Sequence, residues 1–341
     1  MPTPKAARDR HRRPPPPPPS LSTQRPVILA GLAILAVAVL AAAYGLWPGI
    51  RQTGPKPSPG GGPEVVTEVE SLYNDITVYR QNDGKLLLAF GAKRLNYIES
   101  IGDPHDPLDL PVAYTQAMTA GLAYAGGLDD AMIIGLGGGG TGWYHHKSVP
   151  DMHFTAVELD PEVARIADQF FNVRPEKNFD IAIDDGRVFL TGTDRRFDII
   201  LIDAYRGPFV PFHLLTSEFY KLVSAHLKPG GVVVQNVEPT TMLFDSAVAT
   251  IRSAFDNLVF LRGEGNIVIL AYNGPARDEA DLLRTAATRQ AQYRFRYDLT
   301  RILDRRFTPP WKATTKPLTD DFAPVEYLKA IARHNEKQPG S

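Results

Sequence analysis

Residues 131–160, AMIIGLGGGGTGWYHHKSVPDMHFTAVELD, constrain the fold more than any other stretch. An apolar run at 131–134 leads into a glycine-rich loop that includes Gly135, Gly137 and Gly139, and a second apolar run ends in Glu158. We interpret the stretch as strand, glycine turn, helix, strand and acid, the pattern that holds an adenosine-type nucleotide. Glycine permits sharp turns and close approach of a ligand, and the carboxylate can accept both ribose hydroxyls. A glycine run alone also fits a tight turn, but the spacing to Glu158 favours nucleotide binding.

The chain around this stretch alternates strands with helices, which predicts an α/β fold with a Rossmann-like, doubly wound sheet. We expect strands at 131–134, 153–158, 180–183, 197–202 and 232–236, then an antiparallel pair at 258–262 and 267–272. We expect helices at 111–125, 161–171, 216–227 and 240–255, and a polar helical region at 278–306. Runs at 76–79 and 85–90, joined by Asn82-Asp83-Gly84, predict a hairpin of a small antiparallel sheet that precedes the main domain. A third strand of that sheet is expected at 95–98.

Acidic residues follow three of the predicted parallel strands: Glu158, Asp185 and Asp203. In an open α/β sheet the carboxyl ends of the strands face one crevice, where ligands bind. Each acid alone could be a helix N-cap, whereas three in equivalent positions favour a shared site. The loop after Asp203, AYRGPFVPFHLLT, is long for a strand-to-helix connection, and such loops over a ligand crevice are usually functional.

The amino-terminal 62 residues differ from the rest. A basic and proline-rich segment at 1–26 is expected to be disordered, and 27–47 is an uncharged apolar run long enough to span a bilayer. A cleaved signal peptide is the alternative to a membrane anchor, and we favour the anchor because the run exceeds the usual signal core. Residues 48–63 form a Pro/Gly linker. These features predict a single-pass membrane protein, with the side of the membrane on which the globular domain lies left open.

Charge is divided in the same way. Residues 1–62 contain eight Lys or Arg and one Asp, so against a total charge of −1 the rest of the chain carries −8. An acidic globular part argues against nucleic acid as a partner. The chain has no cysteine, which excludes disulfides and thiolate chemistry. His145, His146 and His153 do not match the spacing of a common metal site, so no metal is expected.

Several motifs together resemble the spermidine synthase family of aminopropyltransferases, in particular its membrane-associated bacterial branch. The matching segments are ESLYNDI at 70–76, GLGGGG at 135–140, VELDPEV at 157–163, DDGRVFL at 184–190, IDAYRGPFVPFHLLT at 202–216 and LTDDFAPVE at 318–326. The resemblance covers residues 64–328, and it implies a class I methyltransferase fold with an adenosyl sulfonium co-substrate and no metal. It divides the chain into an N-terminal β domain at 64–110, a catalytic domain at 111–330 and a tail at 331–341.

The resemblance also implies roles for individual residues. Glu158 would hold the ribose, Asp185 with Gly186 the adenine, and Asp203 would bind and deprotonate the attacking amine, with Tyr73 nearby. The remaining substrate candidates are Tyr114, Tyr205, Arg206 and His213. Such a cofactor is already activated, so the enzyme mainly aligns the reactants and supplies a carboxylate base.

Three positions depart from the family pattern. Arg206 replaces the second acid of Asp-x-x-Asp-Pro, no acid lies between Gly135 and Gly142, and Tyr-x-Glu becomes Tyr114-Thr115-Gln116. Aminopropyl transfer from decarboxylated S-adenosylmethionine to an amine such as putrescine is the leading hypothesis. Methyl transfer from S-adenosylmethionine to another small acceptor and a non-catalytic adenosyl-binding domain stay open, as does assembly into a homodimer. A nicotinamide dehydrogenase finds no support.

Overall fold

The computed structural model describes residues 62–91, 97–205, 209–239 and 243–321. The chain divides into two compact units, Met1–Gly54 and Pro55–Ser341, and every described residue belongs to the second. Arg206 and the segments expected at 1–26, 27–47 and 331–341 therefore lie outside the described residues, as does most of the linker. Within the described ranges no helix has the length and apolar character needed to cross a membrane.

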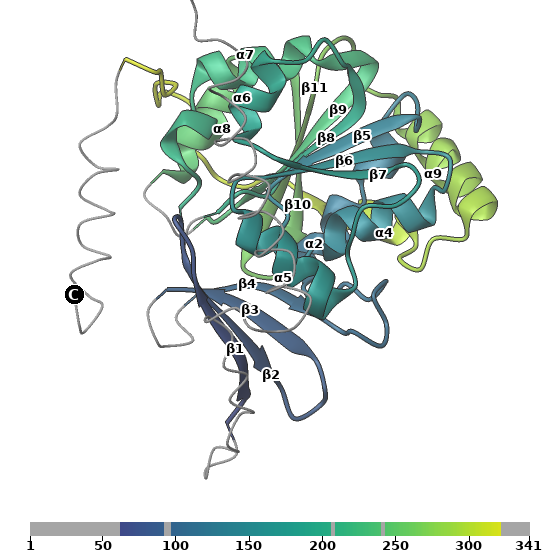
Figure 1. Cartoon of the computed structure of the whole chain (residues 1–341). Coiled ribbons are helices and arrows are strands. Elements are labelled where there is room, and N and C mark those ends of the chain that lie inside the picture. Colours follow the sequence, from purple (N-terminus) through teal and green to yellow (C-terminus); the bar gives the residue numbers. More distant parts are fainter. Residues whose placement is uncertain (1–61, 92–96, 206–208, 240–242, 322–341) are drawn as a thin grey trace, which may run out of the picture. The chain divides into compact units, whose positions relative to one another are not determined.

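A large eight-stranded sheet forms the centre of the described unit (Figure 1). Its strand order is β12-β10-β11-β9-β8-β5-β6-β7, parallel from β9 to β7 and antiparallel from β9 to β12. The strands are β5 (Asp130–Ile134), β6 (His153–Glu158), β7 (Phe179–Ile183), β8 (Phe197–Ile202), β9 (Leu227–Val237), β10 (Asn257–Gly263), β11 (Asn266–Tyr272) and β12 (Arg306–Phe307). The chain leaves β5 toward β6 and then returns to its other side at β8. This reversal creates the crevice in which doubly wound sheets bind ligands.

Helices cover both faces of the large sheet, as the doubly wound prediction requires. One face is covered by α2 (Ala113–Met118), α3 (Gly121–Tyr124), α4 (Gly140–Ser148), α5 (Pro161–Phe171), α9 (Glu279–Tyr293) and α10 (Leu299–Leu303). The other is covered by α6 (Gly186–Thr191), η1 (Phe212–Leu214), α7 (Ser217–Ala225) and α8 (Phe244–Arg252). The strand β8 is buried along its whole length, because its side chains face a core on each side of the sheet.

A small antiparallel sheet precedes the large one, with the order β1-β2-β3-β4. Its strands are β1 (Glu64–Glu70), β2 (Asp75–Arg80), β3 (Leu86–Phe90) and β4 (Ile98–Gly102). The hairpin prediction is confirmed: Gly84 has a φ of 90°, which glycine adopts readily, and Gln81 N–H donates to the Lys85 carbonyl at 2.8 Å. A third strand was predicted at 95–98; residues 95 and 96 lie outside the described ranges, and β4 begins at Ile98.

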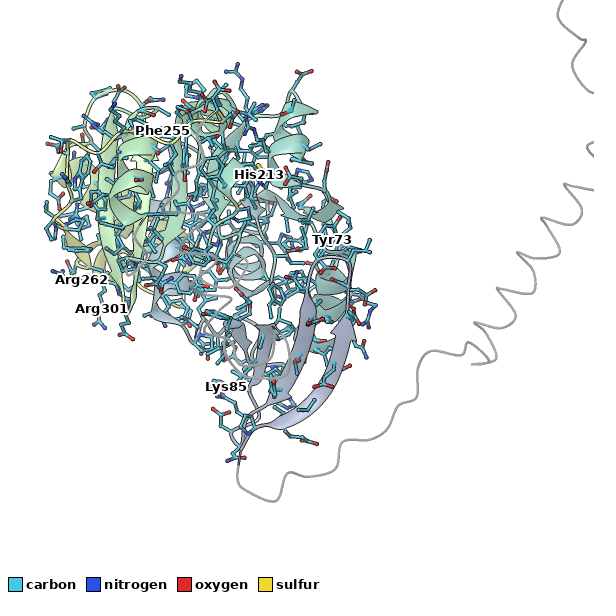
Figure 2. All side chains as sticks on the ribbon, turned by 90° about the vertical axis from the view of Figure 1, so that its left-hand side faces the viewer. Tyr73, Lys85, His213, Phe255, Arg262 and Arg301 are labelled. Atoms are coloured by element: carbon cyan, nitrogen blue, oxygen red, sulfur yellow. The ribbon has the colours of Figure 1, made fainter. Side chains whose placement is uncertain are left out.

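Hydrogen bonds from the β1–β2 turn and from β4 help to attach the small sheet to the large one. The Ser71 hydroxyl, in the β1–β2 turn, donates to Asp160 Oδ2 at 2.5 Å, and Gly138 N–H donates to Ser100 Oγ on β4 at 2.9 Å. Figure 2 shows Tyr73 at the end of the small sheet beside the large one and Lys85 at its far end. The turn that carries Tyr73 is therefore held against the carboxyl ends of the parallel strands.

Two predicted helices are shorter than expected. The segment predicted as one helix at 111–125 divides into two. The first helix, α2, ends at its C-cap Thr119, and the second, α3, ends where Ala125 adopts an extended conformation. The region at 278–306 was predicted as helical throughout, but α9 ends at Tyr293, because the next residue, Arg294, has a φ of 54°, a conformation that stops a helix. The chain then forms α10 and the edge strand β12, which pairs Phe307 with Phe260.

Candidate active site

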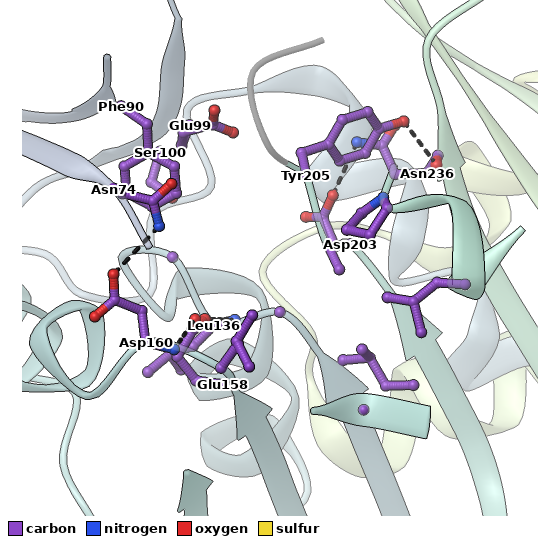
Figure 3. A pocket seen from close by; sticks show the side chains of 18 of the residues that line it. Asn74, Phe90, Glu99, Ser100, Leu136, Glu158, Asp160, Asp203, Tyr205 and Asn236 are labelled. Carbon is purple, nitrogen blue, oxygen red and sulfur yellow. Dashed lines mark hydrogen bonds between the residues drawn. The ribbon is translucent and has the colours of Figure 1, made fainter. Parts of the chain in front are cut away.

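A cavity of about 650 Å³ opens at the carboxyl ends of the parallel strands (Figure 3). Its volume is in the range of small-molecule sites. The walls come from both sheets: Phe90 and Ser100 belong to the small sheet, and Glu158, Asp203 and Asn236 belong to the large one. The site is thus built between the two sheets and depends on the contacts that hold them together.

The three strand-end acids line this cavity in a fixed spatial order. Asp185 follows β7, Glu158 ends β6, and Asp203 follows β8. In the sheet β7 and β8 are separated by β6 and β5, so their ends lie three strand spacings, roughly 14 Å, apart. Asp185 and Asp203 therefore mark opposite ends of the cavity, with Glu158 between them.

The glycine loop forms the floor between these ends. Gly135 has a φ of 93°, and a Cβ there would stand 2.4 Å from the carbonyl oxygen of Asp203, so a side chain cannot be accommodated. Gly137 lines the cavity as well. Gly139 does not: its Cα faces Val173, whose side chain a Cβ would meet at 2.6 Å. The structure therefore gives Gly139 a packing position behind the loop, away from the cavity where the pattern had placed it.

Glu158 is fixed by the loop that follows β5. Its Oε2 accepts the Leu136 N–H at 2.8 Å and its Oε1 accepts the Asp160 N–H at 3.0 Å. Burial raises the pKa of the carboxyl, and these backbone donors oppose the rise. Each carboxylate oxygen has a further lone pair, so the group can still accept two hydroxyls of a ligand.

Asp185 caps α6, and its Oδ1 accepts N–H bonds from Arg187 and Val188 at 2.9 and 3.0 Å. Its Oδ2 lies 2.7 Å from His213 Nε2, and this hydrogen bond lowers the pKa of the carboxyl below its usual value. Gly186 lines the cavity beside it. His213, a substrate candidate in the sequence, is therefore brought to the Asp185 end and not to Asp203.

Asp203 is held by polar groups from two other elements, β9 and α2. Its Oδ1 accepts the Asn236 Nδ2–H at 2.9 Å, and the Tyr114 hydroxyl on α2 also bonds to the carboxylate. Burial raises the pKa of Asp203 to about 6, and the bonds from Asn236 and Tyr114 restrain the rise. A carboxylate with a pKa near the working pH is well suited to general-base catalysis.

The aromatic residues expected at the site are positioned by specific bonds. Tyr205 donates its hydroxyl to the Asn236 carbonyl at 2.9 Å and accepts the Glu238 N–H at 3.1 Å. Tyr73 lines the cavity from the turn whose Ser71 hydroxyl accepts the Tyr73 N–H at 3.0 Å. Of the candidates on described residues, all line the cavity except Gly139.

Some functional positions were missed from the sequence. Asn236 follows the apolar run of β9, so the rule that selected the strand-end acids could have found it. Asn266 donates to Asn236 Oδ1 at 2.8 Å, and Ser100 reaches the glycine loop from β4. These two lie on separate elements, and only the folded arrangement brings them to the site.

The described residues that line the cavity carry mostly negative charge. Among the described lining residues no Lys or Arg is present, and seven carboxylates are: Glu99, Glu158, Asp160, Asp184, Asp185, Asp203 and Glu238. In the described ranges no group of three His, Cys, Asp or Glu is placed to hold a metal ion. Such a site attracts cationic ligands.

Strand order and cavity together define an α/β protein of the class I methyltransferase type with a small antiparallel sheet before it. Comparison with known proteins narrows this class to one family. Residues 114–260 match the spermine/spermidine synthase domain. The polyamine aminopropyltransferase of Vibrio vulnificus is 31% identical over 279 residues, which cover 79% of this chain and 93% of that protein. The chain belongs to this family of transferases.

Solved structures agree in fold. The spermidine synthase of Thermotoga maritima aligns with a TM-score of 0.59 at 19% identity, over 72% of this chain and 84% of its own. A spermidine synthase in complex with the transition state analogue AdoDATO aligns with a TM-score of 0.57 at 18% identity, over the same shares.

Proposed function

We propose that this protein transfers an aminopropyl group from decarboxylated S-adenosylmethionine to a small amine such as putrescine. The observation that carries this proposal is the set of seven carboxylates on a cavity whose described lining holds no Lys or Arg. Both reactants are cations, since one is a sulfonium with a primary ammonium and the other is a diammonium. The same charge pattern does not favour methyl transfer to an anionic acceptor.

The cofactor is assigned along the cavity in the order of the strands. The adenine amino group would meet Asp185 after β7, the ribose hydroxyls would meet Glu158 at the end of β6, and the sulfonium would lie over the glycine loop after β5. The AdoDATO complex of a related fold supports this class of ligand. The order follows from the sheet, because neighbouring strand ends are about 4.8 Å apart.

The decarboxylated form is preferred for an electrostatic reason. S-adenosylmethionine carries a carboxylate next to its amino group, and this carboxylate would enter a cavity lined with acids. Like charges at close range disfavour such binding. The decarboxylated cofactor presents only the ammonium.

Asp203 acts as the base. It takes a proton from the incoming ammonium, the amine nitrogen then attacks the aminopropyl carbon next to sulfur, and the carbon–sulfur bond breaks. The electron pair leaves with methylthioadenosine, and the proton on Asp203 passes to solvent. Tyr114 and Asn236 hold the carboxylate, and Tyr73 and Tyr205 line the space in which the amine is aligned. In this scheme residues 64–110 and 111–330 form the two walls of one site.

Steady-state turnover tests the proposal. The full chain is assayed with decarboxylated S-adenosylmethionine and putrescine, and in parallel with S-adenosylmethionine and putrescine. The first pair should yield spermidine and methylthioadenosine. Absence of aminopropyl product, or equal use of the intact cofactor for methyl transfer, would overturn the assignment.

A further inference from the structure

His213 is the one basic side chain among the described residues that line the cavity, and aminopropyl transfer as proposed gives it no step. It lies on the connection between β8 and α7, a segment that also carries Pro211 and Leu214 into the cavity wall. Its side chain is 46% exposed, so a ligand can reach it from the cavity.

The position of His213 is set by contacts with α6. Its Nε2 lies 2.7 Å from Asp185 Oδ2, and its carbonyl oxygen accepts an N–H from Arg187 at 3.2 Å. Arg187 in turn forms a two-pronged pair with Asp320, at 2.8 and 2.5 Å. The loop is therefore held on α6 through both the side chain and the backbone of His213.

The hydrogen bonds of Asp185 show what this contact does. Oδ1 is already engaged by two backbone N–H groups at the start of α6, so Oδ2 is the oxygen through which the carboxylate can meet a ligand. A carboxylate oxygen accepts two hydrogen bonds. With His213 on one lone pair, the other remains for a donor that enters the cavity.

We propose that His213 is an adenine-recognition residue: it shares Asp185 Oδ2 with the exocyclic amino group and forms the wall beside the base. This inference rests on the proposed adenosyl site. It adds His213, on the connection between β8 and α7, to Asp185 as a residue that determines which base is bound.

The imidazole of His213 supports adenine recognition by its electrostatic effect on Asp185. Its bond with Asp185 stabilises the ionised carboxylate, which accepts hydrogen bonds and cannot donate one until protonated. An ionised Asp185 therefore accepts an amino group and repels a carbonyl oxygen at the same place on the base.

Two nucleosides test the inference by calorimetry on the full chain: 5′-methylthioadenosine, and 5′-methylthioinosine, which has a carbonyl in place of the amino group. His213→Ala should weaken binding of the adenosine compound about tenfold, because Asp185 loses the charge-assisted hydrogen bond that holds its Oδ2 in place and keeps the carboxylate ionised. It should weaken the inosine compound less than twofold. His213→Gln keeps an N–H donor and should restore most of the discrimination.

A double-mutant cycle separates recognition from folding. In an Asp185→Asn background, His213→Ala should cause little further loss, because the two residues act on the same group. His105→Ala removes another exposed histidine, outside the cavity, and should leave both affinities unchanged. Equal weakening of the two nucleosides, or tighter binding of methylthioadenosine by His213→Ala, would overturn the inference. Turnover of the unmodified chain is a separate readout, so failure of aminopropyl transfer and failure of this assignment are distinguishable.

Discussion

Substitution of Asp203 by asparagine should abolish catalysis and stabilise the protein at the same time. Asparagine has nearly the same shape, its amide oxygen can accept the Asn236 N–H, and its NH2 can donate to the Tyr114 hydroxyl, but it cannot take a proton. Loss of a general base lowers kcat by about 10²- to 10⁴-fold. The structure also predicts the effect on stability, because burial raises the pKa of Asp203 from 3.8 to about 6.

The sign of the stability effect follows from linkage. A raised pKa means that the folded state binds the proton more tightly than the unfolded state does, so ionisation of Asp203 destabilises the fold as pH rises through about 6. A shift of two pKa units corresponds to at most about 3 kcal/mol. Asp203→Asn should therefore gain up to about 3 kcal/mol at pH 7.5, and the gain should disappear below pH 4.

Two assays measure these effects. Denaturant unfolding at pH 7.5 and pH 4 gives the stability difference, and kcat/KM for the amine between pH 5 and 8 should rise with a pKa of about 6 in the unmodified enzyme. Asn236→Asp is the matched comparison, because it places a second carboxyl beside Asp203 and should raise that pKa further. A destabilised Asp203→Asn variant at pH 7.5, or one that retains more than a tenth of the activity, would refute the reasoning.

Three further substitutions test other parts of the site. Tyr114→Phe removes a hydroxyl that lowers the pKa of Asp203, so the rising limb of the pH–rate profile should move to higher pH, and an unmoved limb would exclude the contact. Glu158→Gln should weaken methylthioadenosine binding about 10- to 100-fold and the 2′,3′-dideoxy analogue much less; equal losses by calorimetry would count against ribose recognition. Gly135→Ala places a Cβ 2.4 Å from the Asp203 carbonyl oxygen at a residue with a φ of 93°. The substitution should lower the free energy of unfolding by about 2–4 kcal/mol and remove most of the activity. A loss of stability below about 1 kcal/mol would show that the loop can rearrange.

The parts of the fold that were predictable from sequence depend on local pattern. The almost wholly apolar run of β8 and the alternation of strands with helices identified the large sheet and its class. The glycine loop and Glu158 were expected at the carboxyl ends of the strands and lie there, because backbone conformation and strand ends are dictated by residues close together in the chain. Boundaries were less predictable: the helical region predicted at 278–306 includes Arg306, the first residue of β12, and misses the strand, since its pairing with β10 is a tertiary contact.

Three of the seven described acids that line the cavity were predicted from the sequence, and the residues that bond to them were not predicted to do so. Asp185 and Asp203 were placed correctly at the crevice, because any strand-end residue must lie there. The bonds that set their chemistry, from His213 and Asn236, join residues 28 and 33 positions away. The same holds for Ser71 and Asp160, 89 positions apart. No short-range pattern in the sequence encodes such pairs.

A competition reaction tests the central claim most directly. The full chain is incubated with putrescine and equal amounts of decarboxylated and intact S-adenosylmethionine, and the products are identified by mass spectrometry. The acidic cavity and the base at Asp203 predict spermidine with methylthioadenosine and no methylated amine. Methylated putrescine with S-adenosylhomocysteine, or no transfer product from either cofactor, would contradict the account.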